Sequence, residues 1–320
     1  MAVYTDVPDD ELDDFVAEYA IGEVVSCKGI AEGVENSNFL LVTTRGNHIL
    51  TIYEKRVRPD DLPFFIALLE HLARGGIACP TPVHGQDGQA LRRLGGKPAA
   101  IVSFLDGVWV RRPRAEHCIQ VGEALARLHL AGQDFRMRRP NDLSVTGWLR
   151  LFEASERLAD GVEPGLRAGI AAELTALARD WPRDLPRGVI HADLFPDNVF
   201  FRGETLSGLI DFYFACTDFF AYDLAVTMNA WCFEPDGAFN ITKANRLLAG
   251  YESVRPLTRA EKDCMPILAR GAAMRFLLTR LYDSVNTPPG AMVKVKNPRE
   301  YLQKLNFHRS VTDISAYGFS

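Results

Sequence analysis

The residues best suited to chemistry lie in a short stretch past the middle of the chain. Asp193 follows His191 by two positions, Asn198 comes five positions later, and Asp211 lies beyond a short predicted hairpin. This order matches the pattern H-x-D-x-x-x-x-N followed by a metal-binding Asp, which is typical of phosphoryl transfer. That reaction needs an acceptor hydroxyl held in line and metal ions that neutralise the phosphates. We expect Asp193 to orient the hydroxyl, and Asn198 and Asp211 to supply oxygen ligands for Mg²⁺.

The sequence around this stretch must hold it in place. Apolar residues precede and follow it, as expected for a loop between two buried strands. An ordinary polar turn is the alternative, because Asp, Asn and Pro are common turn residues, but four matching positions in register favour the catalytic interpretation. We expect His191 to brace the loop. Asp223 begins a later apolar helix, where it either stabilises the helix N-terminus or binds the backbone of the catalytic loop, the alternative we favour.

Composition and charge narrow the classes of function. The chain has 320 residues, 47% hydrophobic and 24% charged, with a net charge of −5. We therefore expect two domains or lobes, and neither nucleic acid nor an anionic membrane as a partner. The six cysteines show no metal-binding spacing and are predicted to be reduced thiols. The N-terminus lacks the apolar segment of a signal peptide, so we expect a cytoplasmic protein.

The pattern of predicted elements changes about a third of the way along the chain. Strand-like runs and one long helix fill the first hundred residues, whereas helical periodicity dominates from Ala115 onward. The fold class expected is α+β, with a small antiparallel sheet in residues 1–105 and a larger, mainly helical part in residues 106–320. We predict that the first part binds nucleotide and that the second carries the catalytic loop and the acceptor site, with ligands in the cleft between them.

Two segments of the first part are candidates for nucleotide binding. Gly33, Asn36, Ser37 and Asn38 lie between two predicted strands, where small residues and side-chain donors suit a triphosphate. An ordinary hairpin loop is the alternative, which the catalytic loop downstream makes less favoured. Ser103 and Leu105 belong to the strand that ends at the boundary of the two parts, a place where main-chain groups can bind adenine.

The cation expected on the third strand is missing. Aligning the segment that begins at His48 with the usual V-A-I-K pattern puts Thr51 at the Lys position. Lys55 and Arg56 follow just beyond, with Glu70 on the next helix as a possible partner. A solvated strand end is an equally good interpretation of Lys55 and Arg56, so both alternatives stay open.

The sequence gives only weak signals for the residues of the acceptor site. Trp231, Arg275 and Arg280 fall on predicted helices of the second part, and an Arg suits a substrate carboxylate through paired hydrogen bonds. The alternative for each of them is that it is an ordinary packing or surface residue.

Taken together, these motifs resemble the aminoglycoside-phosphotransferase-like kinases, over about residues 25 to 285. Within that family the sequence around Thr51, the catalytic loop and the helix containing Trp231 are similar to bacterial homoserine kinases of the ThrB type. The resemblance implies the two-lobed protein-kinase-like fold, ATP and Mg²⁺ as cofactors, and L-homoserine as the small-molecule substrate. It also implies O-phospho-L-homoserine as the product, in threonine biosynthesis, made by a monomer or weak homodimer.

Two rival functions differ in class. One is a kinase of the same fold that acts on an amino alcohol, an aminoglycoside or a sugar, and a panel of acceptors would separate it from the first. The other is a catalytically inactive binding module, supported only by the missing strand Lys. Intact Asp193, Asn198 and Asp211 argue against that module.

Overall fold

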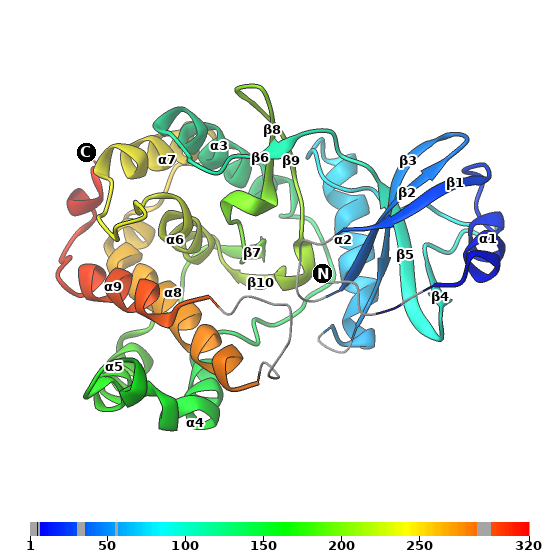
Figure 1. Cartoon of the computed structure of the whole chain (residues 1–320). Helices are drawn as coiled ribbons and strands as arrows, with labels where there is room; N and C mark the ends of the chain where they lie inside the picture. The colour runs from blue at the N-terminus through cyan, green and yellow to red at the C-terminus, as the bar shows by residue number, and fades with distance from the viewer. Residues whose placement is uncertain (1–4, 6, 31–35, 55–56, 287–295, 320) are drawn as a thin grey trace. The chain divides into compact units, whose positions relative to one another are not determined.

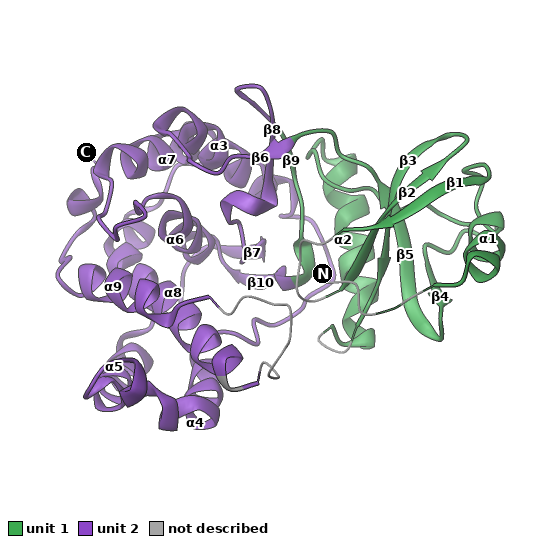
Figure 2. Cartoon of the chain, in the orientation of Figure 1, with its two compact units in different colours: residues 1–107, 207–213 green, residues 108–206, 214–320 purple. Residues whose placement is uncertain are grey.

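The computed structural model describes residues 5, 7–30, 36–54, 57–286 and 296–319. The chain forms two compact units, coloured separately in Figure 2. Unit 1 comprises residues 1–107 and 207–213, and unit 2 comprises residues 108–206 and 214–320. The mixed α+β architecture predicted from the sequence is confirmed, since unit 1 contains an antiparallel sheet and unit 2 is mainly helical.

Unit 1 is built on a five-stranded antiparallel sheet in the order β1-β2-β3-β5-β4. Its strands are β1 (Val24–Gly29), β2 (Ser37–Thr43), β3 (Gly46–Ile52), β4 (Leu91–Leu94) and β5 (Lys97–Ser103). The β2–β3 hairpin closes where Thr43 pairs with Gly46, whose φ of +140° favours glycine. Register then runs to Ser37 opposite Ile52, which fixes the face that each side chain occupies.

The two faces of this sheet carry different side chains. Leu50 and Ile52 of β3 are fully buried in a core with α1 (Asp9–Ala17). Because successive strand residues point to opposite faces, Thr51 lies on the other face, toward α2 (Leu62–Arg74). Figure 1 shows α1 and α2 on opposite sides of the sheet. Thr51 therefore lies apart from the α1 core.

Residues 207–213 contribute to unit 1 although their neighbours in sequence belong to unit 2. Leu209 N donates a 2.8 Å hydrogen bond to the Ala78 carbonyl, and Ser207 Oγ donates to the Asp106 carbonyl at 2.9 Å. Tyr213 packs edge-on against Phe65 of α2, with ring centroids 5.7 Å apart. The sequence-based division at residue 105 had placed this segment with the helical part, because nothing in the local pattern marks its return.

Unit 2 contains seven α-helices and several short strands in its described residues. The helices are α3 (Ala115–Ala131), α4 (Val145–Val162), α5 (Leu166–Asp180), α6 (Phe220–Trp231), α7 (Ile241–Val254), α8 (Arg259–Asn286) and α9 (Pro298–Arg309). The strands are β6 (Val108–Trp109), β7 (Arg187–Ile190), β8 (Val199–Arg202), β9 (Thr205–Leu209, which continues into unit 1) and β10 (Cys216–Phe219). β7 pairs antiparallel with β10, and the catalytic loop begins where β7 ends.

Two helices of unit 2, α3 and α7, pack closely against each other. α3 and α7 approach so closely that a Cβ at Gly122 would lie 2.1 Å from the Leu247 carbonyl oxygen, and one at Gly250 equally close to that of Ile119. α6 is buried on nearly every side, as expected for a central helix with little amphipathic character.

Among the described residues, no helix combines the length and apolarity needed to cross a membrane.

Candidate active site

The catalytic loop leaves β7 in an unusual backbone conformation. His191 is fully buried, and its Nδ1 accepts a 3.3 Å hydrogen bond from the backbone N–H of Asp193. Between them, Ala192 has a φ of +62°, in the left-handed region that costs a residue with a Cβ about 1–2 kcal/mol. A conformation of this kind persists only where its surroundings enforce it.

Asp223, at the start of α6, holds this backbone. Its Oδ2 accepts the N–H of His191 at 2.7 Å, and its Oδ1 accepts the N–H of Ala192 at 2.8 Å. Two roles were considered for this carboxylate, and the contacts are those of the second: Asp223 binds the backbone of the catalytic loop. The side chain is fully buried, so these charge-assisted hydrogen bonds form out of water.

His129 of α3 completes the surroundings of Asp223. Its Nε2 lies 3.0 Å from Asp223 Oδ2, and its Nδ1 lies 2.7 Å from the Tyr251 hydroxyl of α7. Burial pushes the pKa of Asp223 up, but hydrogen bonds and charge from His129 and His191 hold it below its ordinary value. Burial also lowers the pKa of His129 despite Asp223. A neutral imidazole that donates from Nε2 and accepts at Nδ1 satisfies both partners.

Arg275 of α8 holds the same loop from another side. Its Nη1 donates to the Ala192 carbonyl, and its Nη2 lies 3.8 Å from Asp193 Oδ1. The guanidinium lies over the rings of Phe276 and Phe214, at 4.5 and 5.3 Å from their centroids. Because Arg275 is only 1% exposed, its contacts are those of a loop support.

Trp231, at the end of α6, also contacts the loop backbone. Its Nε1 donates a 2.8 Å hydrogen bond to the Leu194 carbonyl, and the side chain is buried. Trp231 and Arg275 were both predicted to face the acceptor. The structure gives both of them contacts with the catalytic loop, and a contact with the acceptor stays a prediction. Sequence reasoning missed this role because the partners lie 37 and 83 residues away along the chain.

Asp193 is the partly accessible carboxylate that this framework presents, with 18% of its side chain exposed. Burial raises its pKa to about 6, and the charges of Arg275 and Lys296 oppose this shift. Asp197 and Asp223 push the pKa further up. A carboxylate with this pKa is ionised at neutral pH and is more basic than an ordinary Asp, which suits a group that accepts a hydroxyl proton.

Asn198 lies in the short 3-10 turn η2 (Pro196–Asn198) that ends the loop. Its Nδ2 donates to the Asp193 carbonyl at 2.8 Å and lies 3.4 Å from Asp193 Oδ2. The amide oxygen therefore points its lone pairs elsewhere and can serve as a hard metal ligand. Asp211 belongs to unit 1 and has a φ of +64°, a second non-glycine residue in the left-handed region. Amide and carboxylate oxygens are each of the ligand type that Mg²⁺ takes.

Thr51, where a strand Lys was expected, belongs to a buried polar cluster in unit 1. Its hydroxyl donates to Asn38 Oδ1 at 2.8 Å, and it also hydrogen-bonds Tyr213. Tyr213 in turn bonds Tyr53, with the two rings edge-on at 5.5 Å. Burial raises the pKa of both tyrosines, so the cluster is neutral. Thus the strand position offers hydroxyl and amide groups instead of a cation.

The other residues of the predicted phosphate loop divide between the two faces of the sheet. Ser37 is fully buried on the face opposite Asn38, and its hydroxyl donates to Glu54 Oε1 at 2.8 Å. Glu54 also forms an ion pair with Lys97, 2.5 Å between Nζ and Oε2. Asn36 is buried, and its Oδ1 accepts a 3.3 Å hydrogen bond from Glu54 N. Gly33, Lys55 and Arg56 lie outside the described residues.

The remaining nucleotide candidates have local partners in unit 1. Glu70 Oε1 lies 2.7 Å from His84 Nε2, and this contact and the Gly88 carbonyl raise the pKa of His84. Ser103 exchanges hydrogen bonds with Thr81, accepting at Oγ and donating from its backbone N–H. Leu105 contacts Gly208, where a Cβ would approach its side chain to 2.9 Å.

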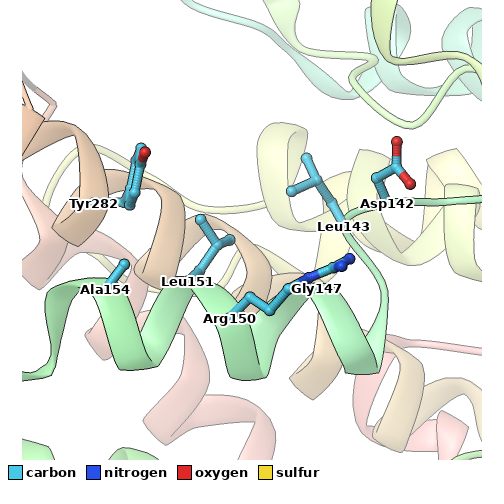
Figure 3. Close-up of a pocket in the computed structure, with 7 residues that line it drawn as sticks. All are labelled: Asp142, Leu143, Gly147, Arg150, Leu151, Ala154 and Tyr282. Atoms are coloured by element: carbon cyan, nitrogen blue, oxygen red, sulfur yellow. The ribbon is translucent and has the colours of Figure 1, made fainter.

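A cavity of about 340 Å³ lies in unit 2 between α4 and the C-terminal part of α8. Figure 3 shows residues of its lining, with Arg150, Leu151 and Ala154 on α4 and Tyr282 on α8. The segment before α4 adds Asp142 and Leu143, and Gly147 completes the wall. None of the predicted site residues lines this cavity.

Comparisons with known proteins agree on one family. A family model described as "Phosphotransferase enzyme family" matches residues 26–257. A homoserine kinase of Rhodospirillum rubrum is 66% identical over 320 residues, covering the whole of both chains. One of Bradyrhizobium diazoefficiens is 62% identical over 99% of this chain and 98% of its own length. Relatives of this kind predict the same fold throughout the chain.

Solved structures show the fold at much lower identity. A microcompartment-associated aminopropanol kinase superposes with a TM-score of 0.72 at 15% identity, covering 98% of this chain and 99% of its own. An amicoumacin kinase gives a TM-score of 0.71 at 14% identity, over 96% and 94% of the two chains. The protein-kinase-like fold expected from the sequence is therefore confirmed.

Proposed function

Because this chain belongs to the phosphotransferase enzyme family, and within it to the homoserine kinases, we propose that it transfers the terminal phosphoryl group of ATP to the side-chain hydroxyl of L-homoserine. The product is O-phospho-L-homoserine, on the route to threonine in the cytoplasm. The observation that carries this proposal is the full-length identity to homoserine kinases, combined with an accessible carboxylate, Asp193, in a supported loop.

Asp193 orients the acceptor hydroxyl and accepts its proton as the oxygen attacks phosphorus. The new bond joins that oxygen to phosphorus, while the bond to the leaving ADP oxygen breaks. The pKa of Asp193, about 6, supports this role, because the carboxylate is ionised at neutral pH and still basic enough to accept a proton. Asp223, Arg275 and Trp231 hold the loop backbone so that the carboxylate keeps one direction.

Asn198 and Asp211 are the residues that would hold Mg²⁺. When bound, the metal neutralises charge on the phosphates and on the leaving group. Asn198 is suited to this by its orientation, since both of its amide contacts to Asp193 are made through Nδ2. The contact between Asn198 and Asp193 also holds these two side chains in a fixed position relative to each other within unit 2.

Unit 1 is proposed to bind the nucleotide. Asn38 and Thr51 offer polar groups on the sheet face opposite the α1 core, so they are better placed for phosphate contacts than Ser37, which Glu54 and the core enclose. Gly33 and Lys55 stay candidates for the phosphates, and Glu70 for pairing with Lys55. Main-chain groups near Ser103 and Leu105 stay candidates for adenine.

An assay of ADP release with a panel of acceptors tests this function. L-homoserine should give the highest kcat/KM, ahead of amino alcohols, aminoglycosides and sugars, and release should require Mg²⁺. Replacing Asp193 by Ala should lower kcat by about 10²–10⁴-fold or more, as expected for loss of a general base. A preference for another acceptor would overturn the substrate, and near-normal turnover of the variant would overturn the role of Asp193.

A further inference from the structure

Lys296 lies beside the catalytic loop although no sequence pattern singles it out. It precedes α9, and its Nζ is 5.4 Å from the centroid of the Phe195 ring. Phe195 is two residues after Asp193, and its own ring packs edge-on against Phe276 at 4.9 Å. Within unit 2, the Asp193 carboxylate and the Phe195 ring of the loop are therefore followed in space by the Lys296 ammonium group, which lies over that ring.

The backbone at Lys296 is anchored by its next neighbour. Asn297 caps α9, since its Oδ1 accepts the N–H of Arg299 at 3.0 Å. The Asn297 carbonyl accepts a 2.9 Å hydrogen bond from Arg280 Nη1 of α8, which also binds Glu300 at 2.6 Å. Arg280 is nearly buried. These contacts tie the residue after Lys296 to both α8 and α9, so the Lys296 side chain starts from a fixed point.

The two cations near Asp193 differ in what they can still bind. Arg275 is buried, donates to the Ala192 carbonyl and is covered by Phe276 and Phe214. Lys296 is exposed, and within the described part of the chain its recorded contact is the ring of Phe195. Lys296 is thus the cation that can receive an anionic group of a ligand whose other end lies at Asp193.

We propose that Lys296 binds the carboxylate of the amino-acid acceptor and so selects an α-amino acid over an amino alcohol. This rests on the proposed function, because Asp193 must hold the acceptor hydroxyl. The order of groups matches the substrate: hydroxyl at Asp193, two methylene groups along the Phe195 ring, carboxylate at Lys296. Contact of an ammonium with a carboxylate is charge-assisted and stronger than a neutral hydrogen bond.

Substitution of Lys296 combined with two acceptors tests the proposal. Lys296→Met should raise KM for L-homoserine about 10- to 100-fold, the range expected for a hydrogen bond to a charged group. For 3-amino-1-propanol, which is homoserine without its carboxylate, kcat/KM or the inhibition constant against homoserine should change less than about threefold. Lys296→Arg, which keeps the positive charge, should recover much of the affinity for homoserine.

Arg246→Met, an exposed cation on α7, is the matched control and should leave both acceptors unaffected. An equal loss with both acceptors would overturn the proposal, because it would place Lys296 at the transferred phosphoryl group or in the structure of the loop. No change with either acceptor would also overturn it. Failure of the wild-type chain to phosphorylate homoserine would instead reject the proposed function, so the two failures are distinguishable.

Discussion

Arg275 Nη2 lies 3.8 Å from Asp193 Oδ1, while Nη1 of the same guanidinium binds the carbonyl of Ala192. One buried cation thus binds the loop backbone and lowers the pKa of the loop carboxylate. Burial raises the pKa of Asp193, and Arg275 is the largest influence that opposes burial. The position and the basicity of Asp193 are therefore coupled through Arg275.

The first prediction concerns the pH dependence of catalysis. Asp193 must be ionised to accept the hydroxyl proton, so kcat should fall as the pH decreases through about 6. Arg275→Met removes a charge that lowers this pKa, and the acidic limb of the kcat profile should move to higher pH. Measurement of kcat from pH 5 to 9 at saturating substrates checks both statements. An acidic limb that stayed in place in the variant would contradict the coupling.

The second prediction is that Asp193 destabilises the folded protein at neutral pH. In the folded protein the pKa of Asp193 is about 6, above the ordinary value of 3.8, so the folded state binds this proton more tightly than the unfolded state does. The stability this contributes is present at low pH and is lost as the pH rises through 6. At pH 8, Asp193→Asn should therefore raise the free energy of unfolding by about 1–3 kcal/mol while abolishing most activity. Urea unfolding at pH 8 and pH 4 measures the difference, which should shrink at the lower pH.

The third prediction separates Asp223 from Asp193. Asp223→Ala leaves the backbone N–H groups of His191 and Ala192 buried without an acceptor. We expect a loss of about 2–6 kcal/mol in the free energy of unfolding, because each of two buried N–H groups left without an acceptor costs about 1–3 kcal/mol, together with a lower kcat. Asp223→Asn keeps one acceptor oxygen and should lose less. Retention of wild-type stability by the Ala variant would show that the loop backbone does not depend on this carboxylate.

The fourth prediction concerns the missing strand cation. Thr51→Lys would bury an ammonium among the uncharged side chains of Asn38, Tyr53 and Tyr213, with Asp211 near enough to raise the pKa of Tyr213. We expect this variant to be less stable than Thr51→Val, which loses a hydrogen bond worth about 1 kcal/mol. Its affinity for Mg²⁺ and an ATP analogue, measured by calorimetry, should not rise. Tighter binding by the Lys variant would indicate that Thr51 directly replaces the usual cation.

The catalytic loop was predictable because its signal is local. His191, Asp193 and Asn198 lie within eight consecutive residues, and apolar strands on either side mark their context. The separation of Ser37 from Asn38 was also present in the sequence. Ser37, Phe39 and Leu41 alternate with Asn38 and Leu40 along β2, so period two assigns Ser37 to the core face.

The supports of the loop were not predictable in the same way. α6 is apolar and buried on nearly all sides, so its periodicity does not tell which side Trp231 faces. Arg275 lies on a long helix, and its partner Ala192 is 83 residues earlier. Lys296 is placed by the contacts of Asn297 with Arg280. Such directions depend on how helices pack against one another, and no local pattern records them.

The return of residues 207–213 to unit 1 has a consequence for how the protein is made. During synthesis the first 107 residues leave the ribosome well before the segment that completes their contacts, and half of the larger unit is made in between. The N-terminal sheet gains its contacts with Leu209 and Tyr213 only after these residues have been made. We therefore expect that unit 1 does not complete its folding before most of unit 2 has been synthesised. Nascent chains arrested before residue 207 should accordingly be more sensitive to protease than chains arrested well beyond residue 213.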